Sequence, residues 1–262
     1  DGTTDSEILT IPLNINAGSS TNEQISCLLN AEDKLYIATF TDNFSRVYQY
    51  NPETGKMLLV GPTITGSGTG SLLADMVWFE GRLWACTTET GGTDKVYSIR
   101  PPSGSFTGDT AWVTEYNPGT NIQFYSMAPF RGLLYVGAGD GDVYVRSSTG
   151  TFSASDNLAA GIRHGLFVYE DKLYAANFIT SNLTYREFNG TSWSQVADLD
   201  TLVGTSAIYV GKPVIFGGNM YVAVAATSSN NGQIVKNASG TWSAVDPTTS
   251  LRGFLAVLEQ GI

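Results

Sequence analysis

The sequence predicts an all-β fold in which a four-stranded antiparallel unit is repeated along the chain. Three observations predict it: a hairpin motif that recurs, a spacing of 39 to 51 residues between copies, and a composition with 29 glycines but only 15% charged residues. Many glycines and few charges are typical of short strands joined by tight turns, and the sequence lacks long amphipathic helical patterns. A chain of 262 residues can form one domain of this kind.

Residues 165–177 hold one copy of the recurring motif. Two apolar runs, 166–169 and 173–176, flank the polar residues 170–172, which predicts two strands joined by a tight turn. Five copies align on the residue that opens the second strand: Leu35-Tyr36, Leu83-Trp84, Leu134-Tyr135, Leu173-Tyr174 and Met220-Tyr221. A degenerate sixth copy is expected at residues 259–262.

Each copy continues into two further strands. Third strands are expected at residues 46–50, 95–99, 142–145, 183–188 and 233–236. A turn and a fourth strand follow, most visibly at residues 190–196 and 240–245. Four strands in a period of roughly 40 to 50 residues are typical of the blades of a propeller.

The motif also resembles a known kind of blade. Its hydrophobic-Phe-x-Gly-x-Leu-Tyr segment, followed by Val-Tyr and then Gly-Thr-x-Trp, is similar to the blade of a kelch-like or tachylectin-like β-propeller, from about Gln24 to Ile262. The turns before Trp193 and Trp242 further resemble degenerate Asp-boxes of sialidase-like blades, although the Asp is missing.

We therefore expect one β-propeller domain over residues 1–262. Full blades are expected at about residues 24–62, 71–115, 123–154, 162–198 and 205–246, and a sixth, reduced blade is expected from residues 250–262 plus 5–16. Propellers commonly build the last blade from both termini, which closes the ring and hides strand edges. A five-bladed ring with trailing strands is the alternative.

The charge balance limits the partners that we expect. The chain has 14 basic and 24 acidic residues, hence a net charge of −10. Such a surface repels phosphate backbones, so no nucleic-acid partner is expected. No apolar run approaches the roughly 20 residues of a membrane-spanning helix, so no membrane insertion is expected. We expect an extracellular or surface-exposed protein, either secreted or virion-associated.

Metal and cofactor chemistry is not expected. Cys27 and Cys86 lie in apolar runs, which favours buried free thiols, with a disulfide as the alternative. With one histidine and no Cys-x-x-Cys, the sequence favours no zinc site. The segment Asp140-Gly141-Asp142 is interpreted as a tight hairpin rather than half of a calcium site. Nucleotide and redox motifs are absent from the sequence, so we expect no cofactor.

The candidate ligand-binding residues lie where the first strands enter the central channel. Alignment of these strands places three cations, Arg163, Lys212 and Arg252, at nearly equivalent positions, and it also brings Tyr125, His164 and Asp75 to the channel mouth. On an acidic protein, a local arc of cations could hold a carboxylate, a sulfate or an acidic sugar. Alternatively, each cation pairs with an acid such as Asp75, or projects into a water-filled channel.

No catalytic residues are expected from the sequence. His164 is the only histidine, no Gly-x-Ser-x-Gly surrounds a serine, and Asp75 is the only acid near the start of a first strand. We therefore predict a non-catalytic binding module with a carbohydrate or protein ligand at the channel-mouth face. The alternative is a structural or adhesion component of a virion, tail or cell-surface assembly, and a glycosidase-like enzyme ranks third.

Overall fold

The structure, a computed structural model, describes residues 24–41, 44–66, 69–90, 93–103, 105–119, 122–158, 165–179, 182–204, 207–226 and 232–246. Over these ranges it contains 22 strands in five antiparallel sheets and one short helix, α1 (Leu199–Val203). No helix in the same ranges is long and apolar enough to cross a membrane. The predicted all-β class is therefore confirmed.

Each sheet is a blade of four strands in chain order, and two blades carry an additional short strand. Blade 1 contains β1 (Gln24–Ala31), β2 (Lys34–Phe40), β3 (Phe44–Asn51) and β4 (Lys56–Leu59), with β5 (Ile64–Thr65) paired to β3. Blade 2 contains β6 (Thr69–Phe79), β7 (Arg82–Thr90), β8 (Val96–Ile99) and β9 (Val113–Tyr116). Blade 3 contains β10 (Phe124–Phe130), β11 (Leu133–Ala138), β12 (Asp142–Arg146) and β13 (Phe152–Asn157).

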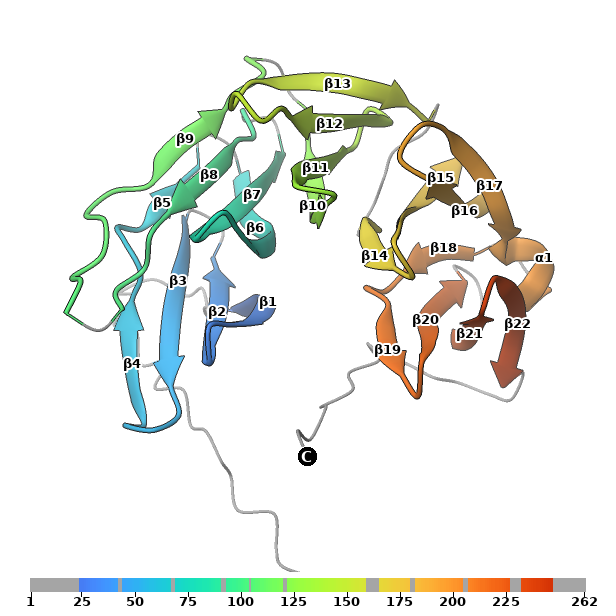
Figure 1. Cartoon of the computed structure of the whole chain (residues 1–262), viewed down its shortest axis with the longest axis horizontal. Coiled ribbons are helices and arrows are strands. Elements are labelled where there is room, and N and C mark those ends of the chain that lie inside the picture. The colour runs from blue at the N-terminus through green and yellow to red at the C-terminus, as the bar shows by residue number, and fades with distance from the viewer. Residues whose placement is uncertain are drawn as a thin grey trace, which may run out of the picture.

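The last two blades follow the same order. Blade 4 contains β14 (Phe167–Tyr169), β15 (Lys172–Ile179), β16 (Asn182–Phe188) and β17 (Trp193–Asp198). Blade 5 contains β18 (Ala207–Val210), β20 (Asn219–Ala226), β21 (Gly232–Ala238) and β22 (Thr241–Asp246), with β19 (Val214–Phe216) also paired to β20. The blades lie around a common centre, toward which the first strands face (Figure 1). The third strands expected from the sequence are present in all five blades.

The turns that lead into the second strands share one backbone geometry. Both turn residues have positive φ in every blade: Glu32 with Asp33, Glu80 with Gly81, Arg131 with Gly132, Glu170 with Asp171, and Gly217 with Gly218. Two successive positive φ values define the turn type whose twist matches that of the flanking strands. The tight turn predicted around residues 170–172 is present, and it consists of Glu170 and Asp171, because Lys172 already belongs to β15.

Four buried clusters join neighbouring blades, and the aromatic residue of the motif enters each of them. Tyr36 packs with residues of blade 2, Trp84 with blade 3, Tyr135 with blade 4 and Tyr174 with blade 5. The recurring Leu-Tyr pair therefore records packing between blades, as expected for repeats that cannot bury their faces alone.

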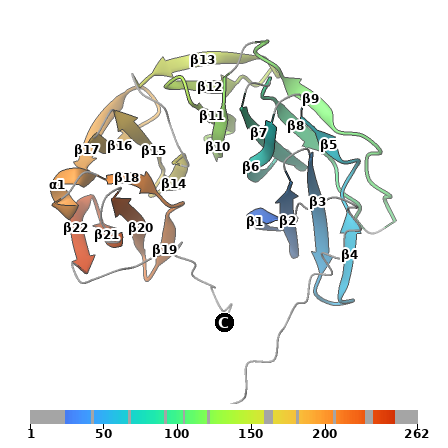
Figure 2. The same cartoon turned by 180° about the vertical axis from the view of Figure 1, so that it is seen from behind.

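Blades 1 and 5 are not neighbours in the part of the chain that the structure describes. No buried cluster of described residues joins them, and both views show the five blades as an open ring (Figures 1 and 2). The sixth blade predicted from residues 250–262 plus 5–16 lies outside the described residues. The number of blades in the complete ring therefore stays a prediction.

Candidate functional site

Two of the predicted ligand-binding residues, Asp75 and Lys212, form an ion pair across the centre of the ring. Asp75 lies on β6 in blade 2, and Lys212 lies between β18 and β19 in blade 5. The distance from Lys212 Nζ to Asp75 Oδ1 is 2.8 Å, and the side chains are 53% and 6% exposed, respectively. Lys212 thus follows the alternative in which the cation pairs with a neighbouring acid.

Asp75 also holds blade 2 to blade 3. Its Oδ2 accepts the backbone N–H of Met127 on β10 at 2.9 Å, and its Oδ1 accepts the N–H of Met76 at 2.9 Å. The next blade repeats this bond, because Ser126 Oγ accepts the N–H of Leu166 at 3.1 Å. Asp75 and Ser126 both lie eight residues before the motif leucine of their blades. The carboxylate is therefore part of the scaffold between blades.

The two cysteines lie close to this ion pair. Both are free thiols, and Cys86 is buried whereas Cys27 is partly buried. Burial, followed by the Asp75 carboxylate, raises the pKa of Cys27 to about 12 and also raises the pKa of Cys86. Burial lowers the pKa of Lys212, but the carboxylate of Asp75 outweighs this and the pKa is raised overall. At neutral pH the thiols are protonated and the lysine is charged, so these groups are poor nucleophiles.

Tyr125 is the other predicted site residue that the structure describes, and it does not join the ion pair. The Tyr125 hydroxyl donates to Gln123 Oε1 in its own blade. A Cβ at Gly139 would lie 2.9 Å from Tyr125 Cε2, so the ring packs closely over this turn. Arg163, His164 and Arg252 lie outside the described residues. The predicted cationic arc is thus represented by Lys212 alone and otherwise stays a prediction.

The predicted hairpin at Asp140-Gly141-Asp142 is confirmed. These residues connect β11 to β12, and Asp140 Oδ1 accepts the backbone N–H of Asp142 at 3.0 Å. Asp140 Oδ2 accepts the Tyr144 hydroxyl at 3.3 Å. Both carboxylate oxygens of Asp140 therefore support the turn and the strand that follows it.

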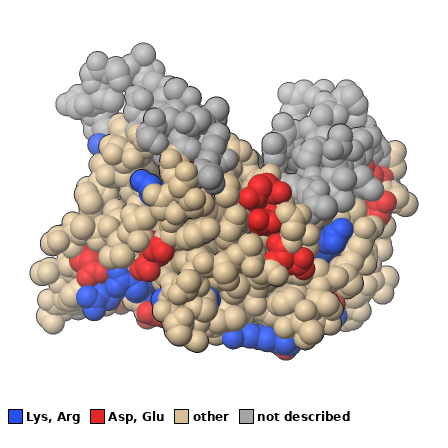
Figure 3. Space-filling view, turned by 90° about the horizontal axis from the view of Figure 1, so that it is seen from above, with Lys and Arg blue, Asp and Glu red and all other residues tan. Residues whose placement is uncertain are grey.

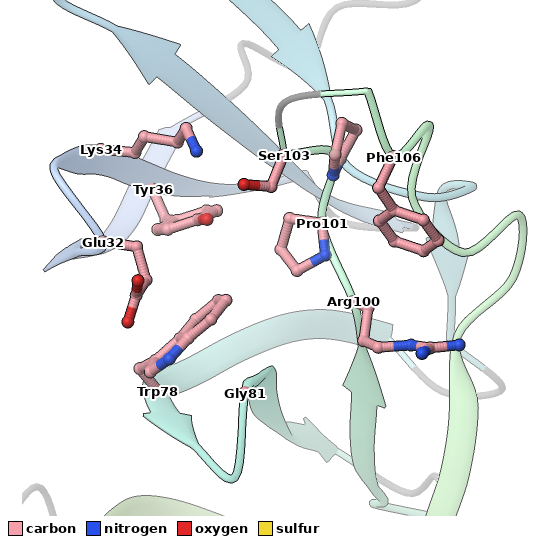
Figure 4. A pocket seen from close by; sticks show the side chains of 10 residues that line it. Glu32, Lys34, Tyr36, Trp78, Gly81, Arg100, Pro101, Ser103 and Phe106 are labelled. Atoms are coloured by element: carbon pink, nitrogen blue, oxygen red, sulfur yellow. The ribbon is translucent and has the colours of Figure 1, made fainter.

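A pocket of about 290 Å³ lies between blades 1 and 2 (Figure 4). It is lined by the β1–β2 turn with β2, by the end of β6 with the turn that follows it, and by the connection after β8. Turns after the first and third strands lie at one end of an antiparallel blade, and loops after the second strands lie at the other end. The pocket is therefore on the face opposite to the predicted channel mouth.

An aromatic pair forms one wall of the pocket. The rings of Tyr36 and Trp78 are stacked, with centroids 6.0 Å apart and an interplanar angle of 24°. Tyr36 is buried, whereas Trp78 is partly exposed. Burial and the Glu32 carboxylate raise the pKa of Tyr36 to about 12, so its hydroxyl stays protonated at neutral pH. Within the described ranges, the indole N–H of Trp78 has no hydrogen-bond partner.

Polar groups of opposite charge surround this aromatic wall. Lys34 and Ser103 extend from opposite sides toward the space beside Tyr36, and Glu32 lies on the same side as Lys34 (Figure 4). Neither Glu32 nor Lys34 forms an ion pair with another described residue. Arg100 points away from the pocket and pairs with Asp109, with a distance of 3.1 Å from its Nη2 to Asp109 Oδ1, while Asp109 also pairs with Arg82 at 3.2 Å.

The connection between β8 and β9 builds the far wall. It spans residues 100–112, whereas the corresponding turns of the other blades have two to five residues. Ser103 and Phe106 exchange two backbone hydrogen bonds of 3.0 and 2.9 Å. At its end, Trp112 Nε1 donates to the Pro62 carbonyl of the neighbouring blade at 3.1 Å. The connection therefore forms a local turn at Ser103 and Phe106, and Trp112 holds its end to blade 1.

The pocket was not predicted from the sequence, because an alignment of the copies shows the motif residues that they share and not the residues that differ between them. The unusual length between Ile99 and Val113, with its Pro101-Pro102 pair, was a visible signal of an insertion in the second copy. The sequence does not show that this insertion faces Tyr36 of the preceding copy. That contact follows only from the order of blades in the ring.

Charges of both signs are interspersed on the outer edge of the described blades. The space-filling view shows Lys and Arg side chains beside Asp and Glu side chains, without a continuous basic patch on this face (Figure 3). Arg146 with Glu80, at 2.9 Å, and Arg131 with Asp171, at 2.8 Å, are pairs of this kind between blades. The expectation that nucleic acid is not a partner stays a prediction.

Comparisons with known proteins show the fold. No family model and no curated protein matches the chain. Among solved structures, it is similar to a Lactobacillus plantarum protein, with 17% identity, a TM-score of 0.57 and coverage of 87% of this chain and 71% of that chain. It is similar to a candidate 6-phosphogluconolactonase from Bacteroides fragilis, with 16% identity, a TM-score of 0.56 and coverage of 86% and 69%.

A third solved structure is named as a propeller. The likeness to the Dos1 propeller has 14% identity and a TM-score of 0.55, and it covers 82% of this chain and 55% of that chain. Together with the five antiparallel sheets, these matches show a propeller-like fold. At such identities they show the fold alone, and the kelch-like, tachylectin-like or Asp-box kinship stays a prediction.

Proposed function

We propose that this protein is a non-catalytic binding module, extracellular or surface-exposed, that holds a neutral carbohydrate in the pocket between blades 1 and 2. One observation carries the proposal: the stacked Tyr36–Trp78 pair lies beside polar groups that have no ion-pair partner among the described residues. A sugar ring has apolar C–H faces and a rim of hydroxyls. The former can lie on an aromatic ring, while the latter bond to polar side chains.

The size and charge of the pocket limit the kinds of ligand that it can bind. A volume of about 290 Å³ lies at the lower end of ligand sites, which run from roughly 300 to 1,000 Å³. Glu32 and Lys34 oppose one another in charge, and Arg100 points away from the pocket toward Asp109. These features favour a small, neutral, hydroxyl-rich group. The acidic ligand expected at the channel mouth is not what this pocket favours.

The arrangement of the acids supports binding over catalysis. Glycoside hydrolysis typically needs two carboxyl groups roughly 5 to 9.5 Å apart. Glu32 is the one carboxylate among the described residues that line the pocket, and Asp75 holds Lys212 and two backbone N–H groups instead. The name of one structural neighbour suggests lactone hydrolysis, so this reaction belongs in the test.

A glycan array, followed by titration of the best ligand, tests the proposal. The wild type should bind a neutral saccharide, and Trp78→Ala should lose at least about tenfold in affinity, as for an aromatic anchor. Trp193→Ala is a matched control, because Trp193 is also stacked, on Phe188 in blade 4, with centroids 5.1 Å apart. If both variants bind the saccharide as tightly as the wild type, the pocket is not the ligand site. Turnover of fluorogenic glycosides or 6-phosphogluconolactone would show that the protein is an enzyme rather than a binding module.

A structural or adhesion role in a virion, tail or cell-surface assembly is the second candidate. The faces of blades 1 and 5 that no other described blade covers favour it, because Leu28 on blade 1 and Phe216 on blade 5 are exposed large apolar residues. Native mass measurement of the protein in its source tests this role. A stable complex with other chains supports it, whereas a free monomer opposes it.

A further inference from the structure

The turn that joins β16 to β17 in blade 4 contains an Asn-Gly pair. The turn spans residues 189–192, which are all exposed, and it begins with Asn189 and Gly190. The backbone nitrogen that follows an asparagine can attack the amide carbon of the asparagine side chain, and a glycine hinders this attack least because it has no Cβ. The reaction, deamidation, converts asparagine into aspartate or isoaspartate. The surroundings of the turn decide whether it is favoured here.

Two hydrogen bonds activate the side-chain amide of Asn189. Its Oδ1 accepts the backbone N–H of Thr191 at 2.9 Å and that of Ser192 at 3.1 Å. Two donors on one carbonyl oxygen stabilise the negative charge that develops on this oxygen when the carbon is attacked. The bond from Thr191 also folds the side-chain amide back over the peptide between Asn189 and Gly190. The carbon that is attacked therefore lies over the peptide that contains the attacking nitrogen.

Arg131 of the neighbouring blade 3 acts on that peptide. Its Nη1 donates to the backbone oxygen of Asn189 at 2.8 Å, and a Cβ at Gly190 would overlap the same Nη1. A cation on the peptide oxygen favours the anionic form of the peptide, so it makes the N–H of Gly190 more acidic. Among the described residues, no hydrogen bond uses this N–H. The proton that must leave first is thus exposed and activated.

Two other turns have the same side-chain bond but cannot react in this way. Asn51 Oδ1 accepts the N–H groups of the residues two and three positions later, at 2.9 and 3.3 Å, and Asn117 Oδ1 accepts the N–H two positions later at 2.9 Å. The next residue is Pro52 in one turn and Pro118 in the other. Proline has no N–H, so its nitrogen cannot become the nucleophile.

We propose that Asn189 is a site of spontaneous deamidation that Arg131 promotes, with water as the co-reactant. The nitrogen of Gly190 gives its proton to hydroxide and attacks Cγ of Asn189. A bond between this nitrogen and Cγ forms, the bond between Cγ and Nδ2 breaks, and ammonia leaves. Water then opens the cyclic imide at either of its carbonyl carbons, which gives aspartate or isoaspartate. One water is consumed for each ammonia released, and nothing is oxidised or reduced.

The modification changes the contact between blades 3 and 4. It puts a carboxylate at position 189, beside the guanidinium of Arg131, which is paired with Asp171 at 2.8 Å. The new carboxylate competes with Asp171 for this cation. Isoaspartate also lengthens the main chain of the turn by one atom. The turn therefore records the age of the protein as a change in charge and in the contact between two blades.

Peptide mapping of the full chain after incubation in mildly alkaline water labelled with heavy oxygen tests the proposal. The wild type should incorporate the label at position 189 and not at positions 51 and 117, where proline follows. Asn231-Gly232 is the same dipeptide elsewhere in the chain and serves as a reference in the same sample. Absence of label at position 189 would overturn the proposal.

Arg131→Met tests the role assigned to the guanidinium. It should slow the reaction at position 189 at least about threefold, because the barrier rises when the N–H is less acidic, and it should leave the rate at position 231 unchanged. If Arg131 only restrained the turn, its removal would free the turn and speed the reaction. Arg131→Lys keeps a cation and should react faster than Arg131→Met. An unchanged or higher rate at position 189 in Arg131→Met would contradict the promotion.

Discussion

Replacing Asp75 by alanine tests whether this carboxylate belongs to the scaffold or to a ligand site. The substitution removes the acceptor of the Met127 and Met76 N–H groups, both in buried hydrogen bonds of 2.9 Å. A buried donor that loses its partner costs about 1 to 3 kcal/mol. The lost contact with Lys212 adds at most about 1 kcal/mol, because an ammonium that is 53% exposed can be solvated by water. With two such donors, we therefore expect Asp75→Ala to lower the free energy of unfolding by about 2 to 7 kcal/mol.

Urea denaturation of a matched set measures this magnitude. Asp75→Asn keeps an acceptor oxygen for Met127 and should cost about 1 to 2 kcal/mol, and Lys212→Met should cost at most about 1 kcal/mol. Ser126→Ala, which removes the equivalent bond to Leu166, should cost about 1 to 2 kcal/mol. If Asp75→Ala is no more destabilising than Lys212→Met, the carboxylate is not a scaffold residue, and the reasoning about its role is wrong.

Three further predictions concern the backbone and the thiols. Gly165→Ala should lower the free energy of unfolding by at least about 2 kcal/mol in urea denaturation, because its Cβ would lie 2.4 Å from Ala176 Cβ. Gly211→Ala should lower it by less than about 1 kcal/mol, since the nearest neighbour of its Cβ would be 3.6 Å away. Equal losses in the two variants would refute this prediction. Asp33→Gly should stabilise the fold by about 0.5 to 1 kcal/mol because φ is 55°, and a lower Tm would count against it. The pKa of Cys27 is raised from 9.0 to about 12, so the contribution of its protonated thiol to stability is complete below pH 9 and is lost as pH rises toward 12. At pH 8, the thiols of the native protein should react with a disulfide reagent far more slowly than those of the denatured protein, and equal rates would contradict their burial.

Much of the fold could be predicted because the repeat records contacts that recur. Leu35-Tyr36 and its equivalents reveal the second strand of every blade, and the aromatic residue is needed wherever one blade packs on the next. Two residues repeat the pattern but lack a full neighbour in the described structure: Tyr221 in blade 5 and Leu28 in blade 1.

The candidate site was harder to predict because it depends on residues that differ between copies. The pairing of Lys212 with Asp75 was open in the sequence, which places them 137 residues apart, and only the ring brings them to 2.8 Å. The pocket depends on Trp78, on Tyr36 from another blade, and on residues 100–112, which are an insertion in one copy. Sequence periodicity contains no information on contacts of this kind.

Equilibrium titration of the best saccharide from the array into three proteins tests the central claim most directly. The wild type and Lys212→Met should bind with the same affinity, because Lys212 is at the channel and is paired with Asp75. Trp78→Ala should bind at least about tenfold more weakly, because the aromatic wall of the pocket is removed. If Lys212→Met loses binding while Trp78→Ala keeps it, the ligand site is the channel mouth and the pocket between blades 1 and 2 is not the site.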